Sequence, residues 1–251
     1  MHELHLFAGI GGGILGGMLL GHTCVCAVEI EPYCRRVLLQ RQREGIIPRF
    51  PIWDGVQTFN AQPWRGKVDV VCGGFPCQDI SVAGKGAGID GERSGLWREF
   101  ARVIREIRPH FVFVENSPTL TCRGLGRVLG DLAKMGYNAE WCVLGASDTG
   151  ARHRRKRIWI LGANTVRQQR NSGPWKLLRP EGERSRVQTI DDLWPALKPV
   201  YQGWEVEPSV GRMANGVADG MDRLKAIGNG QVPIVAATAF RLLQRRMVVE
   251  A

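Results

Sequence analysis

The chain has 251 residues, with 34 Lys and Arg against 24 Asp and Glu, so its net charge is +10. This length suits one large domain, or a large domain with a small companion. No apolar run is long enough to span a membrane, and the N-terminus lacks the pattern of a signal peptide. Seven cysteines without a Cys-x-x-Cys pair fit neither a disulfide framework nor a zinc site. We therefore expect a reducing, cytoplasmic location and no metal.

Short apolar segments alternate with helical segments in the first two thirds of the chain. We expect helices near 12–20, 31–43, 96–107 and 122–135, and strands over 4–7, 24–28, 68–72, 111–114 and 158–161. Such alternation predicts right-handed βαβ units and a mainly parallel sheet, which is an α/β fold.

The alternation ends after residue 162. Residues 163–210 mix Gln, Arg, Pro, Trp and Gly without sustained periodicity, which is typical of an irregular small domain or a long insertion. An apolar helical pattern returns over 232–247. We therefore divide the chain into a main domain of residues 1–162, a small region of 163–210, and a C-terminal segment of 211–251 that packs back onto the main domain.

A glycine-rich turn follows the first expected strand. Residues 7–13 read Phe-Ala-Gly-Ile-Gly-Gly-Gly, and glycines at a strand-to-helix turn let the backbone approach a ligand closely. Gly11-x-Gly13-x-x-Gly16 also fits the dinucleotide pattern, which is a weak signal by itself. Glu29 ends the second expected strand, where an acid commonly binds ribose hydroxyls. These residues predict a nucleoside-bearing cofactor without identifying it.

The sequence Gly-Gly-Phe-Pro-Cys-Gln at 73–78 follows the third expected strand. Pro76 fixes its own φ and biases Phe75 toward extended geometry, so Cys77 is expected on a stiff loop. The carboxyl end of a strand in an open α/β sheet is where ligands bind. Cys77 is therefore either a nucleophile or a small buried cysteine, and this motif alone leaves both open.

Half of the net charge lies in one short block. Residues 151–162 hold five Lys and Arg and no acid, all within 152–157. A block this dense favours a polyanion such as nucleic acid.

These motifs, taken together, resemble those of the DNA cytosine carbon-5 methyltransferases of the compact bacterial and phage type. The resemblance rests on motifs that occur in the family's order: Phe7–Gly12, Glu29, Asp54, Pro76-Cys77-Gln78, Arg93–Leu96, Glu115-Asn116-Ser117, Arg155-x-Arg157 and Gly228–Pro233. One such match is weak, but the ordered set is specific. His153, Ser117 and Gly55 depart from the family's usual pattern.

The resemblance implies a Rossmann-like S-adenosylmethionine-dependent methyltransferase fold with a small irregular target-recognition region at 163–210. Residues 1–162 would form the catalytic and cofactor-binding domain. The cofactor would be S-adenosylmethionine, with Glu29 on its ribose and Asp54 near its adenine. The full set implied for the cofactor is Phe7, Ala8, Gly9, Ile10, Gly11, Gly12, Glu29, Ile30, Asp54, Gly55, Leu96, Asn229 and Gly230.

The implied reaction explains why these residue types occur together. The Cys77 thiolate would attack carbon 6 of cytosine, because carbon 5 is otherwise a poor nucleophile. Glu115 would act as the acid at ring nitrogen 3. Pro76 and Asn116 would position the catalytic loop, and Arg155 would bind the base.

A stacked base cannot be reached, so the cytosine must leave the duplex. The glycine-rich stretch 81–95 is a candidate lid over Cys77. Candidate DNA contacts are Ser81, Arg93, Arg152, Arg154 and Arg157, with an ion pair to a nearby acid as the alternative for Arg157.

The partner implied is double-stranded DNA, bound by a monomer, with a cognate restriction endonuclease as a candidate partner. Three alternatives stay open. A nicotinamide-dependent oxidoreductase would explain the glycine pattern only. A DNA-binding relative without catalysis and a tRNA-cytosine methyltransferase share the motifs, and assays of methyl transfer to DNA and RNA distinguish them.

Overall fold

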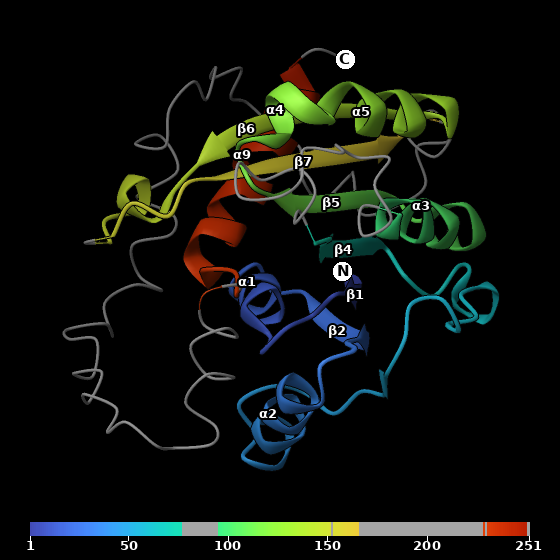
Figure 1. Ribbon diagram of the computed structural model, residues 1–251, viewed down its shortest axis with the longest axis vertical. Coiled ribbons are helices and arrows are strands. Elements are labelled where there is room, and N and C mark those ends of the chain that lie inside the picture. The colour runs from blue at the N-terminus through green and yellow to red at the C-terminus, as the bar shows by residue number, and fades with distance from the viewer. Residues whose placement is uncertain (77–94, 152, 166–227, 229, 250–251) are drawn as a thin grey trace.

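The computed structural model describes residues 1–76, 95–151, 153–165, 228 and 230–249. Seven strands among these residues form one sheet in the order β3-β2-β1-β4-β5-β7-β6 (Figure 1). The strands are β1 (His2–Leu6), β2 (Thr23–Val28), β3 (Ile52–Trp53), β4 (Val70–Gly74), β5 (Phe111–Asn116), β6 (Tyr137–Leu144) and β7 (Arg157–Asn164). The helices are α1 (Gly12–Leu19), α2 (Pro32–Arg43), α3 (Leu96–Ile107), α4 (Leu120–Arg123), α5 (Leu125–Lys134) and α9 (Pro233–Val249). Short 3₁₀ turns cover Gln62–Trp64 and Ala146–Thr149.

The expected α/β fold with a mainly parallel sheet is confirmed. Strands β1 to β5 pair in parallel, but β7 pairs antiparallel with both β5 and β6. The sheet is thus mainly parallel, as expected, and the strand at 158–161 is its antiparallel member. Strand β6 was not expected, because polar residues such as Asn138 and Glu140 interrupt its apolar pattern. It lies at the edge of the sheet, where strands need not be apolar on both faces.

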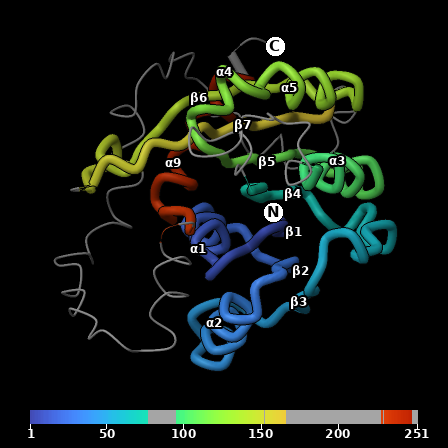
Figure 2. Tube along the Cα trace, viewed as in Figure 1, coloured from blue at the N-terminus to red at the C-terminus, as the bar shows by residue number. Residues whose placement is uncertain are grey.

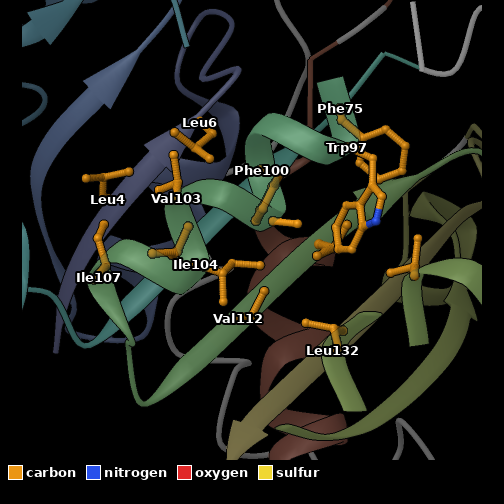
Figure 3. Close-up of a cluster of buried hydrophobic side chains, with 14 of the residues drawn as sticks. Leu4, Leu6, Phe75, Trp97, Phe100, Val103, Ile104, Ile107, Val112 and Leu132 are labelled. Atoms are coloured by element: carbon orange, nitrogen blue, oxygen red, sulfur yellow. The ribbon is translucent and has the colours of Figure 1, made fainter. Parts of the chain in front are cut away.

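Both faces of the sheet are covered, so its central strands are nearly continuous apolar runs. Alternate residues point to opposite faces. Leu4, Val71 and Val112 pack with α3 and α5 on one face, and Figure 3 shows Leu4 and Val112 in this cluster. Val70 and Phe113 pack with α9 on the other face. Within the described residues, no helix is both long and apolar enough to cross a membrane.

Helix α9 lies beside α1, although the two are at opposite ends of the described chain (Figure 2). Glycines make this approach close. A Cβ on Gly16 would lie 2.9 Å from the Cβ of Ala236 and 2.9 Å from the carbonyl oxygen of Pro233. A Cβ on Gly12 would lie 2.1 Å from the carbonyl oxygen of Gln231. Gly12 of the first motif and Gly16 of the dinucleotide pattern therefore make room for the C-terminal segment, a role not foreseen from the sequence.

The division at residues 162 and 210 stays a prediction. Strand β7 runs to Asn164, so the sheet extends slightly past the first expected boundary. Residues 166–227, which include most of the expected target-recognition region, lie outside the described residues.

We predict that Gly16→Ala destabilises the protein by about 1–3 kcal/mol, since the new methyl group overpacks the contact between α1 and α9. The matched control is Gly130→Ala in α5, where a Cβ meets no heavy atom within 4 Å. That change should be neutral or stabilise by up to about 1 kcal/mol, because alanine favours a helix. Urea unfolding of both variants checks this, and equal stabilities would contradict the packing role of Gly16.

Candidate active site

The carboxyl ends of β1, β2, β4 and β5 lie along one edge of the sheet. The glycine loop follows β1, Glu29 follows β2, Phe75 and Pro76 follow β4, and Glu115 lies near the end of β5. This edge is where parallel sheets bind ligands. The glycine loop, Glu29, Pro76 and Glu115, which were selected from the sequence, thus lie along one edge of the sheet.

The glycine loop is fixed by the carboxylate of Glu29. The backbone nitrogen of Gly9 donates to Oε2 of Glu29 at 2.6 Å, and that of Glu31 donates to Oε1 at 2.8 Å. Burial raises the pKa of Glu29, and these two hydrogen bonds oppose the rise. Phe7 has φ +54°, an unusual value for a residue with a side chain, and Gly11 has φ +89°. The loop is therefore a constrained turn anchored to the end of β2.

Two large apolar side chains are exposed beside Glu29. Ile30 is 64% exposed and Trp53 is 47% exposed. They are near each other because the backbone nitrogen of Glu29 donates to the carbonyl oxygen of Trp53 at 2.9 Å. Asp54 and Gly55 follow Trp53 directly. A flat apolar ligand group suits this position, and Trp53 was missed from the sequence because it lies in a strand of only two residues.

Glu115 is a buried carboxylate with two arginines beside it. It is 9% exposed, and Nε of Arg157 lies 2.9 Å from its Oε1. A side-chain hydrogen bond also joins it to Gln231. Burial raises the pKa of Glu115, while Arg157, Arg155 and Gln231 act in the opposite direction. Burial prevails, so this carboxyl keeps its proton to a higher pH than an ordinary glutamate.

Two arginines of the basic block, Arg155 and Arg157, make contacts within the protein. Arg157 has its ion pair with Glu115 and also donates to the carbonyl oxygen of Lys156. Arg155 donates from Nη2 to the carbonyl oxygen of Gly230. Burial lowers the pKa of Arg155. Arg154 is exposed, so it remains open to a partner, whereas Arg157 has the intramolecular role that was its alternative.

Asn116 joins the ends of β4 and β5. Its Nδ2 donates to the carbonyl oxygen of Phe75 at 3.0 Å, and its Oδ1 accepts from the backbone nitrogen of Ser117 at 2.8 Å. The ring of Phe75 packs on Trp97, with centroids 5.5 Å apart (Figure 3). The backbone just before Pro76 is therefore held from two sides. This geometry fits the positioning role expected for Asn116.

A pocket lies between the glycine loop and Glu115. Its walls come from the ends of β1 and β4 and from the segment before α9: His5, Leu6, Phe7, Ala8, Gly9, Gly13, Gly73, Gly74, Glu115, Gly230 and Gln231. Leu96 begins α3 and is half-buried against the core. Five selected residues, Cys77, Ser81, Arg93, Arg152 and Asn229, lie outside the described residues.

A buried polar cluster lies close to this pocket. Oε2 of Glu3 is 2.8 Å from Nε2 of His5, and its Oε1 is 2.7 Å from Nδ1 of His22. Cys72 also contacts Glu3, and ligand-type atoms of Glu3, His5 and Cys72 lie within 4.8 Å of one another. Because both oxygens of Glu3 engage histidines, we interpret the cluster as a hydrogen-bonded network. Nothing in the sequence of β1 distinguished it from ordinary polar positions.

Comparison with known proteins identifies the family to which the chain is similar. A family model described as C-5 cytosine-specific DNA methylase matches residues 1–203. The type II methyltransferase M2.BsuMI of Bacillus subtilis is 32% identical over 171 residues, which cover 65% of this chain and 42% of that protein. M.NgoMIV of Neisseria gonorrhoeae is 30% identical over 202 residues, which cover 76% of this chain and 59% of that protein. The chain thus spans only 42% to 59% of the length of these two relatives.

Solved structures support the fold. The Entamoeba histolytica methyltransferase EhMeth superposes with a TM-score of 0.64 at 13% identity, covering 98% of both chains. The S. pombe Dnmt2 methyltransferase gives a TM-score of 0.53 at 19% identity, covering 81% of this chain and 66% of that one. At these identities the likeness concerns the fold alone.

We predict that Glu3 makes stability dependent on pH in the acid range. Burial alone would raise the pKa of Glu3, but hydrogen bonds and charge interactions with His22 and His5 lower it to about 2. A carboxylate with a depressed pKa stabilises the folded state above its unfolded pKa of about 4.3, and this contribution is lost as the pH falls toward 2. The shift corresponds to roughly 2–4 kcal/mol.

Chemical unfolding of wild type and Glu3→Gln between pH 7 and pH 2 measures this contribution. The variant should be less stable at pH 7, and the difference between the two proteins should shrink through the acid range. A difference that stays constant with pH would show that Glu3 contributes by packing alone.

Proposed function

Since the chain belongs to the C-5 cytosine-specific DNA methylase family, we propose that it methylates carbon 5 of a flipped-out cytosine in a specific duplex DNA sequence. One observation carries the proposal. Gly74, at the end of β4, pairs with Glu115 at the end of β5, and β4 leads through Phe75 and Pro76 into Cys77. The candidate acid thus lies beside the strand that leads to the candidate nucleophile.

The family's methyl donor is S-adenosylmethionine, and the described residues suit it. Glu29 offers a carboxylate at the end of β2 for ribose hydroxyls. The exposed faces of Ile30 and Trp53 suit an adenine ring, with Asp54 next to them. When bound, the donor supplies a methyl group on a sulfonium. The proposed binding set also includes the glycine loop, Gly230 and Leu96 at the start of α3. Asn229, which lies outside the described residues, completes this set.

The reaction follows from the roles of two side chains, Cys77 and Glu115. The Cys77 thiolate adds to carbon 6 of cytosine while Glu115 gives its proton to nitrogen 3, so electron density moves to carbon 5. Carbon 5 takes the methyl group, and the electrons of the broken carbon–sulfur bond stay on the donor's sulfur, which becomes a neutral thioether. A solvent water then takes the proton from carbon 5, which expels Cys77 as a thiolate, and the nitrogen 3 proton returns to Glu115. The raised pKa of Glu115 keeps the acid form available nearer neutral pH.

The two arginines hold Glu115 and its surroundings. The ion pair of Arg157 fixes the orientation of the Glu115 carboxyl. Arg155 lies close enough to Glu115 to influence its charge, which supports its proposed place beside the base. Asn116 keeps the backbone before Cys77 in place.

DNA contacts are proposed for residues around this site. Arg154 is exposed, and Arg152, Ser81 and Arg93 complete the set, while Arg157 would reach DNA only by leaving Glu115. The energy for flipping the base would come from such contacts. A monomeric state, a cytoplasmic location, a restriction endonuclease partner and target recognition by 163–210 belong to the same proposal.

We predict that Glu29→Ala weakens S-adenosylmethionine binding by about 1–3 kcal/mol, because charge-assisted hydrogen bonds are lost. This corresponds to roughly 5- to 150-fold in affinity. Calorimetric titration checks the value, with Glu44→Ala at the end of α2 as an exposed control. Unchanged affinity in a folded Glu29→Ala protein would refute the ribose assignment, and tight binding of a nicotinamide cofactor instead would refute the donor.

The nucleophile is tested with DNA that carries 5-fluorocytosine at the target. Fluorine replaces the proton that must leave carbon 5, so methyl transfer proceeds and the thioether to Cys77 persists. The complex should survive denaturing electrophoresis, require S-adenosylmethionine, and vanish in Cys77→Ser, since a hydroxyl is a far weaker nucleophile at neutral pH. The target sequence must be known before this trapping experiment. Bisulfite sequencing of DNA from cells that express the chain identifies it.

The other cysteines supply the controls for trapping. Burial raises the pKa values of Cys24, Cys26, Cys72 and Cys142, which keeps them as thiols. Cys122 is exposed, so Cys122→Ser is the matched variant and should trap normally. An adduct mapped to Cys122 or Cys72 would overturn the mechanism. Faster transfer to structured RNA than to duplex DNA would favour a tRNA-cytosine methyltransferase.

A further inference from the structure

Gln231 contacts three parts of the candidate active site at once. It follows Gly230 and precedes α9, and its side chain hydrogen-bonds to Glu115. Its backbone and side chain also lie against the start of α1, at Gly12 and Gly13. It was not selected from the sequence, where it was read only as part of the motif around Asn229.

Glycines leave the space that Gln231 occupies. A Cβ on Gly12 would lie 2.1 Å from the carbonyl oxygen of Gln231, and one on Gly13 would lie 2.5 Å from its Oε1. On the opposite side, a Cβ on Gly74 would lie 2.3 Å from Oε2 of Glu115 and 3.5 Å from Nε2 of Gln231. The side chains of Gln231 and Glu115 therefore occupy space that a larger residue at Gly12, Gly13 or Gly74 would fill.

The carboxyl group of Glu115 is held from two directions. Arg157, at the start of β7, contacts Oε1. Gln231 supplies a neutral amide from the segment before α9, which Arg155 anchors through the carbonyl oxygen of Gly230. A neutral amide orients a carboxyl group without adding a full charge, so the acid form of Glu115 is not suppressed as a second ion pair would suppress it.

We propose that Gln231 is a positioning residue that orients the Glu115 carboxyl and links it to the glycine loop on the cofactor side. The inference rests on the proposed function, because it takes Glu115 as the acid. If the glycine loop moved, the Gln231 side chain would transmit this movement to the carboxyl group of Glu115. Proton transfer at the base is thereby linked to the geometry of the cofactor loop.

The test compares Gln231→Met with Gln244→Met. Methionine keeps the length of glutamine and removes its hydrogen bonds. Gln244 is also buried on α9, but its Nε2 has no hydrogen-bond partner in the described part of the chain. Gln244→Met should therefore keep wild-type activity. Thermal melting confirms that both variants fold, and Gln231→Glu, which is nearly isosteric, serves as a second substitution if Gln231→Met does not.

We expect Gln231→Met to lower kcat by roughly 10- to 100-fold, as a misplaced catalytic group does, with little change in KM for DNA. The alkaline limb of its kcat–pH profile should move to higher pH, since loss of a donor to the carboxylate raises the pKa of Glu115 further. In Gln231→Glu the limb should move in the same direction, because a second carboxylate disfavours ionisation. Profiles that match Gln244→Met would overturn the inference.

A measurement without turnover separates this inference from the proposed function. Carbon-13 NMR of the Glu115 carboxyl should show a higher titration midpoint in Gln231→Met than in wild type or Gln244→Met. If folded wild-type protein transfers no methyl group to any DNA, the proposed function is wrong, and the NMR titration alone decides whether Gln231 governs Glu115. Identical midpoints in all three proteins would refute the positioning role.

Discussion

The ion pair between Glu115 and Arg157 is the interaction on which the site depends, and the direction of β7 makes it available. A buried carboxylate without a partner is strongly unfavourable. Because β7 runs antiparallel to β5, its first residues meet the last residues of β5, with Asn116 opposite Ile158. A parallel β7 would bring its first residues to the opposite edge of the sheet. The single reversed strand next to β5 therefore delivers positive charge to the edge where ligands bind.

Much of the fold followed from local pattern, because the central strands are apolar on both faces. The stretch around Val68–Cys72 was expected as a strand, and β4 covers Val70–Gly74. Glu115 was expected at a strand end and lies there. These predictions succeed because a short apolar run between turn-forming residues is typical of a buried strand. The half-exposed edge strand β6 carries no such run, and it was missed.

The partners of individual residues could not be predicted in the same way. The glycines of the first motif were assigned to a ligand, yet two of them face protein atoms: Gly11 faces Leu38 of α2 and Gly12 faces Gln231. Gln231 likewise contacts residues that are distant from it in the sequence. Glu3 and its partner His5 are polar residues of β1, and the second partner, His22, lies outside that strand. A single sequence records that a residue is small or polar, but it does not record which distant atom that residue meets.

The packing of α1 against α9 also has a consequence for the order of events during synthesis. The pocket wall combines the first strand of the chain with Gly230 and Gln231, more than 200 residues later. Contacts between such distant segments form late, because a long loop must close first. A nascent chain can thus pair β1 with β2 and β4 on the ribosome and still lack this wall. Complete closure of the pocket waits for Gly230 and Gln231 to emerge, so this wall forms only after translation has passed the start of α9.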